Sequence, residues 1–224
     1  MNDPTESQFD ELAELCADAR RILFITGAGI SADSGLPTYR GIGGLYDRNL
    51  TDEGLEIEEA LSGDMMAQRP DITWKYIAQI EAACRGVQPN AAHDAIAWLE
   101  AARDGVTVLT QNIDGLHRAA GSRDLIEIHG TLHSLLCTGC GERQEVPDYE
   151  SLALPPACLE CGSLLRPEVV LFGEALPRQA VDRLLAVLEV GVDLVFSIGT
   201  TSVFPYIAEP VVDEIGRASG RERV

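Results

Sequence analysis

The chain has 224 residues, of which 46% are hydrophobic and 24% charged, values typical of a globular protein that buries a core. No apolar run approaches the roughly 18 residues of a membrane helix, and the acidic N-terminus lacks the apolar stretch of a signal peptide. On these two grounds we expect a cytoplasmic protein. The formal net charge of −19 disfavours binding to nucleic-acid phosphate or anionic lipid, so we expect neither as a partner.

Short apolar runs alternate with helical segments along the chain. Residues 9–20 have helical spacing, and the run 21–31 is apolar until it breaks at a Gly-Ala-Gly turn. Similar runs recur at 106–114, 124–130, 168–174 and 193–202, with helical segments at 90–102, which Asn90 would cap, and at 177–189. Runs that are apolar throughout indicate strands buried on both faces of a parallel sheet. We therefore predict an α/β fold with a doubly wound, Rossmann-like parallel sheet.

Two segments interrupt this alternation. Residues 41–87 show no strand pattern but have helical stretches near 52–62 and 70–85, and residues 131–165 hold four cysteines. Each segment leaves the sheet after the carboxyl end of a strand, the edge where open α/β sheets bind ligands. We therefore expect a second, smaller lobe over that edge. The predicted domains are a Rossmann-like one at 9–40, 88–130 and 166–214, and a small helical and cysteine lobe at 41–87 and 131–165.

The Gly27-Ala28-Gly29 turn follows the first predicted strand and precedes a segment expected to be helical. Glycines in that place let the backbone approach a pyrophosphate, whose charge a helix N-terminus then stabilises. The motif is not a complete G-x-G-x-x-G, because Ala32 stands where the third glycine would be. It is therefore compatible both with nucleotide binding and with a tight strand-to-helix turn.

Polar side chains also follow two later strands. Gln111, Asn112 and Asp114 end the run 106–114, where an amide and a carboxylate can hold a carboxamide or a ribose, or can cap a turn. His129 ends the run 124–130 and would reach the same crevice, either as a general base or as a buried, hydrogen-bonded histidine. The remaining histidines lack such a placement, and we interpret them as structural: His93, His117 and His133.

Four cysteines form two Cys-x-x-Cys pairs, Cys137/Cys140 and Cys158/Cys161, separated by 17 residues. A reducing compartment disfavours disulfides, and this spacing is typical of a zinc module. Four thiolates complete a tetrahedral shell without an open position, so we expect one structural zinc ion and not a catalytic one. The two other cysteines lie in helical segments and are interpreted as core-packing thiols: Cys16 and Cys84.

Six stretches of the chain together resemble, in the same order, the motifs of the sirtuin family of NAD-dependent protein deacylases. They are "GAGISADSGLPTYRG", "TQNIDGLHRAAG", "EIHGTLH", the CxxC…CxxC pairs, "RPEVVLFGE" and "GTTSVFP". The resemblance extends from about Arg21 to Glu209, almost the whole chain. It implies that NAD is the cofactor, that the cysteines hold zinc, and that a cleft between the lobes takes an acylated lysine.

The resemblance also implies a role for each motif residue. Those expected at the cofactor are Gly27, Ala28, Gly29, Ser31, Tyr39, Arg40, Gln111, Asn112, Asp114, Gly199, Thr200 and Ser202. Those expected along the lysine tunnel and the peptide are Val170, Phe172, Gly173 and Val203. Within the cofactor set, Asn112 and Asp114 would hold the carboxamide, and together with His129 they form the expected catalytic set.

The same resemblance implies a reaction. The acyl oxygen would attack C1′ of the nicotinamide ribose, nicotinamide would leave, and an alkylimidate would form. His129 would then act as a base on the ribose hydroxyls, so that lysine and O-acyl-ADP-ribose are released. Positive charge at C1′ requires a dry, close-fitting site more than it requires a nucleophile. The sequence has no G-x-S-x-G elbow and no H-E-x-x-H, which disfavours a serine hydrolase or a zinc-water hydrolase.

Three features depart from the family pattern. Tyr39 stands where many sirtuins have phenylalanine, which keeps the aromatic cover and adds a hydroxyl group. Gln79, three residues after Tyr76, replaces the arginine with which members that prefer succinyl or malonyl groups bind the acid, so deacetylation is predicted. Residues 215–224 contain none of the family's final strand and resemble a non-native tail, so we expect a chain truncated at its C-terminus.

Three functions are compatible with these observations. The leading one is an NAD-dependent protein-lysine deacetylase that acts on acetylated proteins or peptides. The alternatives are protein mono-ADP-ribosyl transfer, which uses the same cleavage of NAD, and a non-catalytic NAD- and zinc-binding interaction module. Binding alone would not require a base, so the presence of His129 disfavours the module. None of these functions implies a particular oligomeric state.

Overall fold

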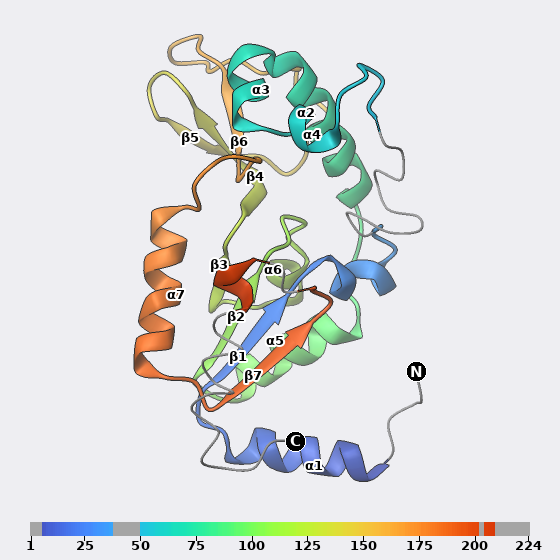
Figure 1. Cartoon of the computed structure of the whole chain (residues 1–224), viewed down its shortest axis with the longest axis vertical. Coiled ribbons are helices and arrows are strands. Elements are labelled where there is room, and N and C mark those ends of the chain that lie inside the picture. Colours follow the sequence, from blue (N-terminus) through green and yellow to red (C-terminus); the bar gives the residue numbers. More distant parts are fainter. Residues whose placement is uncertain (1–5, 38–49, 202–203, 209–224) are drawn as a thin grey trace.

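The computed structural model describes residues 6–37, 50–201 and 204–208 and places them in two parts (Figure 1). The expected tail at 215–224 lies outside these ranges. The larger part contains a four-stranded parallel sheet of order β3-β2-β1-β7. Its strands are β1 (Ile22–Thr26), β2 (Val106–Thr110), β3 (Leu125–Glu127) and β7 (Leu194–Ile198).

The two central strands are buried on both faces. All five residues of β1 and all five of β2 are buried, which explains why neither strand alternates between apolar and polar residues in the sequence. Thr26 ends β1 and pairs with Thr110 on one side and with Ile198 on the other. The carboxyl ends of three neighbouring strands therefore lie side by side.

Helices cover both faces of this sheet (Figure 1). The helical elements of the larger part are α1 (Glu6–Asp18), the 3-10 helix η1 (Ala28–Ser34), α5 (Ala91–Ala102), α6 (Leu116–Ala120) and α7 (Arg178–Val190). On one face Ile96 of α5 packs in a cluster with Phe24, and on the other Leu184 of α7 packs in a cluster with Leu23. This arrangement confirms the predicted doubly wound, Rossmann-like sheet.

The smaller part combines helices with a second sheet (Figure 1). Its helices are α2 (Ile57–Ala60), α3 (Gly63–Gln68) and α4 (Pro70–Cys84). Its antiparallel sheet has the order β5-β4-β6 and consists of β4 (Gly130–Cys137), β5 (Arg143–Glu145) and β6 (Leu165–Val169). Trp74 of α4 is fully buried and donates from Nε1 to the Leu165 carbonyl at 3.1 Å, so it joins the helices to the sheet.

One predicted strand belongs to a different sheet. The run 168–174 is predicted in the parallel sheet, whereas β6 ends at Val169 and pairs antiparallel with β4 in the smaller part. The prediction is wrong because a short apolar run carries no information about its partner strand. β6 in fact alternates buried and half-buried residues, as a strand with one face on a core does.

The helix predicted near 52–62 is also shorter than expected, since α2 covers only four residues and α3 begins after it.

Within the described ranges, no helix combines the length and the apolar character that crossing a bilayer requires.

Candidate active site and metal centre

The carboxyl edge of the parallel sheet brings three strand ends together. Gly27 follows β1, and its amide donates to the Ile198 carbonyl at 3.1 Å. Gln111 follows β2, and its amide donates to the Thr26 carbonyl at 3.0 Å. Gly199 follows β7, and its carbonyl accepts the amide of Gly29, the second glycine of the first turn, at 2.9 Å. The three loops are therefore held against one another by main-chain hydrogen bonds.

Side chains cannot be accommodated where the loop after β1 meets the loop after β7. A Cβ atom on Gly27 would lie 2.8 Å from the Gly199 carbonyl oxygen, and one on Gly29 would lie 2.7 Å from the Gly199 Cα. Gly199 itself has a φ of +65°, and a Cβ there would lie 2.2 Å from the Ile30 nitrogen. The glycines let two backbones pack directly and leave a surface of main-chain atoms, which the close approach of a pyrophosphate needs.

The polar residues after β2 are hydrogen-bonded to the first glycine loop. Ser31 Oγ donates to Asp114 Oδ2 at 2.7 Å. Asn112 Nδ2 donates to the Gly27 carbonyl and to Ser31 Oγ, both at 3.2 Å. Asp114 Oδ1 also accepts the Leu116 amide at 3.0 Å, which fixes the carboxylate at the start of α6. Residues from two loops thus form one half-buried polar cluster.

The third loop joins the cluster through Gln111, whose Nε2 donates to Thr200 Oγ1 at 2.8 Å. The structure therefore brings together, at one sheet edge, the predicted residues Gly27, Ala28, Gly29, Ser31, Gln111, Asn112, Asp114, Gly199 and Thr200. Four other predicted site residues lie outside the described residues: Tyr39, Arg40, Ser202 and Val203.

His129 follows β3 at the same edge and is held at both ring nitrogens. Its Nδ1 lies 2.9 Å from the Gln111 carbonyl, which can only accept, so Nδ1 carries the hydrogen. Its Nε2 lies 2.8 Å from the hydroxyl group of Tyr206, a residue that no sequence motif indicated. Burial lowers the pKa of His129 and the bond to Gln111 raises it, the effect of burial being larger. A neutral imidazole with its lone pair on Nε2 is suited to general-base chemistry.

The segment after β6 lies between His129 and the smaller part. The Val170 amide donates to the His129 carbonyl at 2.9 Å. Phe172 pairs through both its amide and its carbonyl with the backbone of residues 61–63, each hydrogen bond measuring 3.0 Å. Gly173 follows directly, and the Phe172 side chain remains 38% exposed. Three residues predicted at the substrate therefore form one continuous stretch beside the histidine.

An ion pair that sequence analysis missed fastens this stretch. Arg166 donates to both carboxylate oxygens of Glu174, at 2.6 and 2.9 Å, and to the Val169 carbonyl at 3.0 Å. Glu174 also accepts the Leu171 amide at 3.0 Å. Burial raises the pKa of Glu174, but the hydrogen bonds from Arg166 and Leu171 lower it, and the net result is a lowered pKa. The sequence did contain a signal for this ion pair, because Arg166 and Glu174 have opposite charges and lie eight residues apart on either side of an apolar run.

Asn90 caps α5, as predicted, and also supports the glycine loop. Its Oδ1 accepts the amides of Ala92 and His93 at 3.0 and 3.4 Å. Its Nδ2 donates to the Ile30 carbonyl at 2.7 Å and to Ser34 Oγ at 3.0 Å. One side chain therefore connects the start of α5 to two residues of η1.

Two buried histidines pack beneath this cluster. The rings of His93 and His117 have centroids 4.8 Å apart, and His117 Nε2 lies 2.9 Å from Thr26 Oγ1 at the end of β1. Burial, followed by the nearby His93, lowers the pKa of His117 to about 4. These burial and packing contacts agree with the structural role predicted for both residues.

The four predicted zinc ligands form a cluster in the smaller part. All four Sγ atoms lie within 4.8 Å of one another, with Cys137 3.4 Å from Cys161 and Cys140 3.8 Å from Cys158. Zinc–sulfur bonds of about 2.3 Å place tetrahedral thiolates roughly 3.8 Å apart, so the four positions fit one zinc ion. The closed set of donors is that of a structural site.

The length of β4 separates this metal centre from the candidate active site (Figure 1). The strand begins at Gly130, next to His129, and ends at Cys137, a distance on the order of 20 Å for eight extended residues. Cys16 in α1 and Cys84 in α4 lie outside the cluster, as predicted. Cys84 packs against the core of the smaller part, whereas α1 buries none of its residues, so the prediction of a core-packing thiol is wrong for Cys16.

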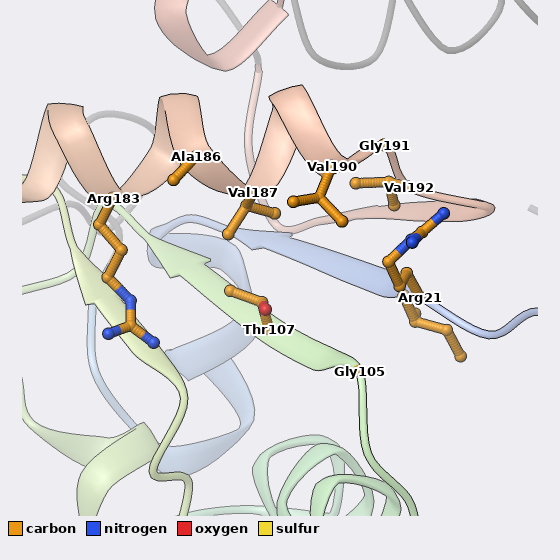
Figure 2. A pocket seen from close by; sticks show the side chains of 10 residues that line it. Arg21, Gly105, Thr107, Arg183, Ala186, Val187, Val190, Gly191 and Val192 are labelled. Atoms are coloured by element: carbon orange, nitrogen blue, oxygen red, sulfur yellow. The ribbon is translucent and has the colours of Figure 1, made fainter.

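Two cavities lie beside these features. The first, of about 320 Å³, opens at the amino ends of β1 and β2, where Thr107 faces Val187 of α7 and Arg21 and Arg183 lie at either end (Figure 2). It is at the opposite end of the strands from the polar cluster and is not the candidate active site. The second, of about 360 Å³, lies between the end of α4, α6 and β4, and Asp114 contributes to its wall.

Known proteins of one family are similar to this chain. The Sir2 family matches residues 27–205. The "NAD-dependent protein deacylase 2" of Pseudomonas syringae pv. tomato is 53% identical over 205 residues, which cover 90% of this chain and 82% of that relative.

Two solved structures are also similar. A mutant Sir2 homologue in complex with ADP-ribose has a TM-score of 0.82 and 35% identity, over 97% of this chain and 82% of that chain. A mutant Sir2 in complex with a deacetylated p53 peptide and 3′-O-acetyl-ADP-ribose has a TM-score of 0.78 and 29% identity, over 93% and 82% of the two chains.

We expect the purified protein to contain one zinc ion per chain, measured by plasma mass spectrometry. Cys161→Ser should lose most of this zinc and lower the melting temperature by about 10 °C, because binding of a structural metal contributes directly to folding. Cys16→Ser, which changes a cysteine outside the cluster, should have the zinc content and the melting temperature of the parent. Parent protein purified without chelator that contains no zinc would contradict the metal assignment.

The free energy of unfolding should decrease as the pH falls from about 6.5 to about 4. His117 is neutral when folded down to pH about 4, whereas the unfolded chain takes up its proton near pH 6.5, so protonation favours unfolding in that interval. His117→Gln keeps a hydrogen-bonding group near Thr26 but cannot be protonated in this range. Its free energy of unfolding should therefore decrease by on the order of 3 kcal/mol less than that of the parent over the same pH interval. Urea unfolding at several pH values measures it, and parallel curves for parent and variant would disprove it.

Proposed function

The chain belongs to the Sir2 family, and on this basis we propose that it is an NAD-dependent protein-lysine deacetylase. It would transfer the acetyl group of an acetylated lysine to ADP-ribose with release of nicotinamide. The observation that carries the proposal is the meeting of a glycine-lined backbone surface, the Asn112–Asp114 pair and a neutral His129 at one sheet edge. The name of the Pseudomonas syringae relative and the peptide complex of the similar structure support the same class of reaction.

The geometry around the glycine turns supports NAD as the co-substrate. Any Cβ on Gly27, Gly29 or Gly199 would fill the space between the two loops, so this surface consists of main chain, as pyrophosphate binding favours. Asn112 and Asp114 offer an amide and a carboxylate, which complement the carbonyl and amino groups of a carboxamide. When bound, NAD supplies the ribose carbon that accepts the acyl oxygen.

His129 is oriented for proton transfer after nicotinamide has left. The Gln111 carbonyl fixes the hydrogen on Nδ1, which leaves Nε2 as the basic atom. The same carbonyl would stabilise the imidazolium that forms when a ribose hydroxyl loses its proton. Burial keeps the ring neutral beforehand, and the exclusion of water protects a reactive ribose carbon from hydrolysis.

The stretch from Val170 to Gly173 is suited to hold the peptide. Its backbone is anchored to His129 on one side and to residues 61–63 on the other, and the Phe172 side chain offers an exposed apolar surface. A substrate peptide would add as a strand along this stretch, with Val203 on its other side, and main-chain hydrogen bonds would provide affinity without a strict sequence requirement.

The surroundings of Tyr76 support a preference for acetyl over acidic acyl groups. The hydroxyl group of Tyr76 donates to Glu53, and Gln79 lies exposed on the same helix. The neighbouring Lys75 is paired with Asp52 at 3.0 Å and with Glu53 at 2.7 Å. The family resemblance places an acidic acyl group at the positions of Tyr76 and Gln79, where its carboxylate would meet anionic groups and a cation already paired with them, which disfavours succinyl-lysine.

Incubated with NAD and an acetyl-lysine peptide, the protein should form O-acetyl-ADP-ribose, nicotinamide and free lysine, which mass spectrometry detects. His129→Ala should lower the rate about 10²- to 10⁴-fold because the general base is lost, while the zinc content stays unchanged. A succinyl-lysine peptide should react about tenfold more slowly than the acetyl peptide.

Two results of this assay would contradict the proposed deacetylase and would indicate another function. ADP-ribose attached to protein, without deacetylated peptide, would indicate a mono-ADP-ribosyltransferase. Binding of NAD without either product would indicate a non-catalytic binding module. Equal turnover by the parent and His129→Ala would remove His129 from the catalytic set.

A further inference from the structure

Tyr206 lies against the candidate base although it belongs to none of the motifs. It lies in the described helical residues 205–208, which follow β7, and Ile207 of this segment is buried in the core. Its ring stacks on Phe204 with centroids 5.4 Å apart and an interplanar angle of 13°, and it meets the His129 ring edge-on at 6.0 Å. These contacts hold the hydroxyl oxygen 2.8 Å from His129 Nε2.

The hydrogen positions in this contact are determined on the other side of the ring. The Gln111 carbonyl accepts from Nδ1, so a neutral His129 has its only lone pair on Nε2. The Tyr206 hydroxyl is therefore the donor and Nε2 the acceptor. That lone pair is the one a general base uses, so it cannot accept a ribose hydroxyl directly while Tyr206 stays in place.

The packing favours a tyrosine that stays and passes the proton on. The amides of Ile207 and Ala208 both donate to the Phe204 carbonyl at 2.9 Å, and Ile207 is fully buried, so the turn is fixed. A phenol that donates its hydrogen still has lone pairs with which to accept another hydrogen bond. We propose that Tyr206 is a further catalytic residue that relays a proton from a ribose hydroxyl of the bound co-substrate to His129. This inference rests on the proposed function.

The relay conserves protons and charge. The O–H bond of the ribose would break as its oxygen bonds to the acyl carbon of the alkylimidate, whose C=N π electron pair would move to the lysine nitrogen, and the proton would move to the Tyr206 oxygen. The proton of Tyr206 moves at the same time to His129 Nε2, so the phenol ends neutral and the imidazole ends as an imidazolium. Burial raises the pKa of Tyr206, which disfavours a free tyrosinate as a separate intermediate of the relay. The imidazolium proton is then available to the departing lysine nitrogen.

Tyr206→Phe tests the relay because it removes the hydroxyl group and keeps the ring that stacks on Phe204. Formation of O-acetyl-ADP-ribose should fall about 100-fold. Exchange of labelled nicotinamide into NAD, which precedes the proton transfer, should stay within about threefold of the parent, as should the KM for NAD. A double variant with His129→Ala should react no more slowly than His129→Ala alone, because both residues act in one transfer.

Tyr149→Phe is the matched control, since this buried tyrosine donates to the Leu132 carbonyl in the smaller part, and it should turn over like the parent. Parental turnover in Tyr206→Phe, with or without a lower KM for NAD, would show that the hydroxyl only occupies Nε2 in the free protein and would overturn the relay. Loss of exchange together with turnover would also overturn it, because the residue would then support folding or binding. A parent without product or exchange would refute the proposed function itself.

Discussion

Close backbone packing at the carboxyl edge of the parallel sheet is the constraint on which the rest of the structure depends. Gly27 and Gly29 approach Gly199 so closely that a side chain on any of the three would overlap main-chain atoms. This contact sets the loops after β1 and β7 against each other. The loop after β2 is attached to the same place because Asn112 donates to the Gly27 carbonyl and Asp114 accepts from Ser31. A surface of main-chain atoms with polar side chains at its border is the result, and we propose that a dinucleotide would lie there.

The smaller part completes the site from the other side of that edge. The stretch after β6 is bonded to the His129 carbonyl at Val170 and to the backbone of residues 61–63 at Phe172, so it depends on both parts for its position. The cysteine cluster lies at the far end of β4, where an ion would hold the turns of the lobe together without touching the reacting groups. The metal centre and the candidate active site are thus separated by a strand, so a bound zinc ion would act on the proposed reaction only through the stability of the lobe.

Features that depend on local sequence could be predicted, and features that depend on tertiary partners could not. The continuous apolar runs of β1 and β2 indicated buried parallel strands, and the spacing of the cysteines indicated their cluster. The run 168–174 was assigned to the wrong sheet because an apolar run does not indicate which strand it pairs with. Tyr206 was missed because its contact with His129 joins positions 77 residues apart, and no periodicity or motif connects them. Asn90 was predicted as a cap, but its bond to Ile30, 60 residues away, was not predicted.

Titration calorimetry of NAD binding to Gly199→Ala tests the central claim most directly. Gly54→Ala is the control, because Gly54 has a similar positive φ of +76° but no atom within 4 Å of an added Cβ, so it shares the backbone strain without the overlap. We expect Gly199→Ala to keep its zinc and to bind NAD at least about tenfold more weakly than the parent, and Gly54→Ala to bind like the parent. Parental NAD affinity in Gly199→Ala would show that the close contact of the two loops does not shape the site.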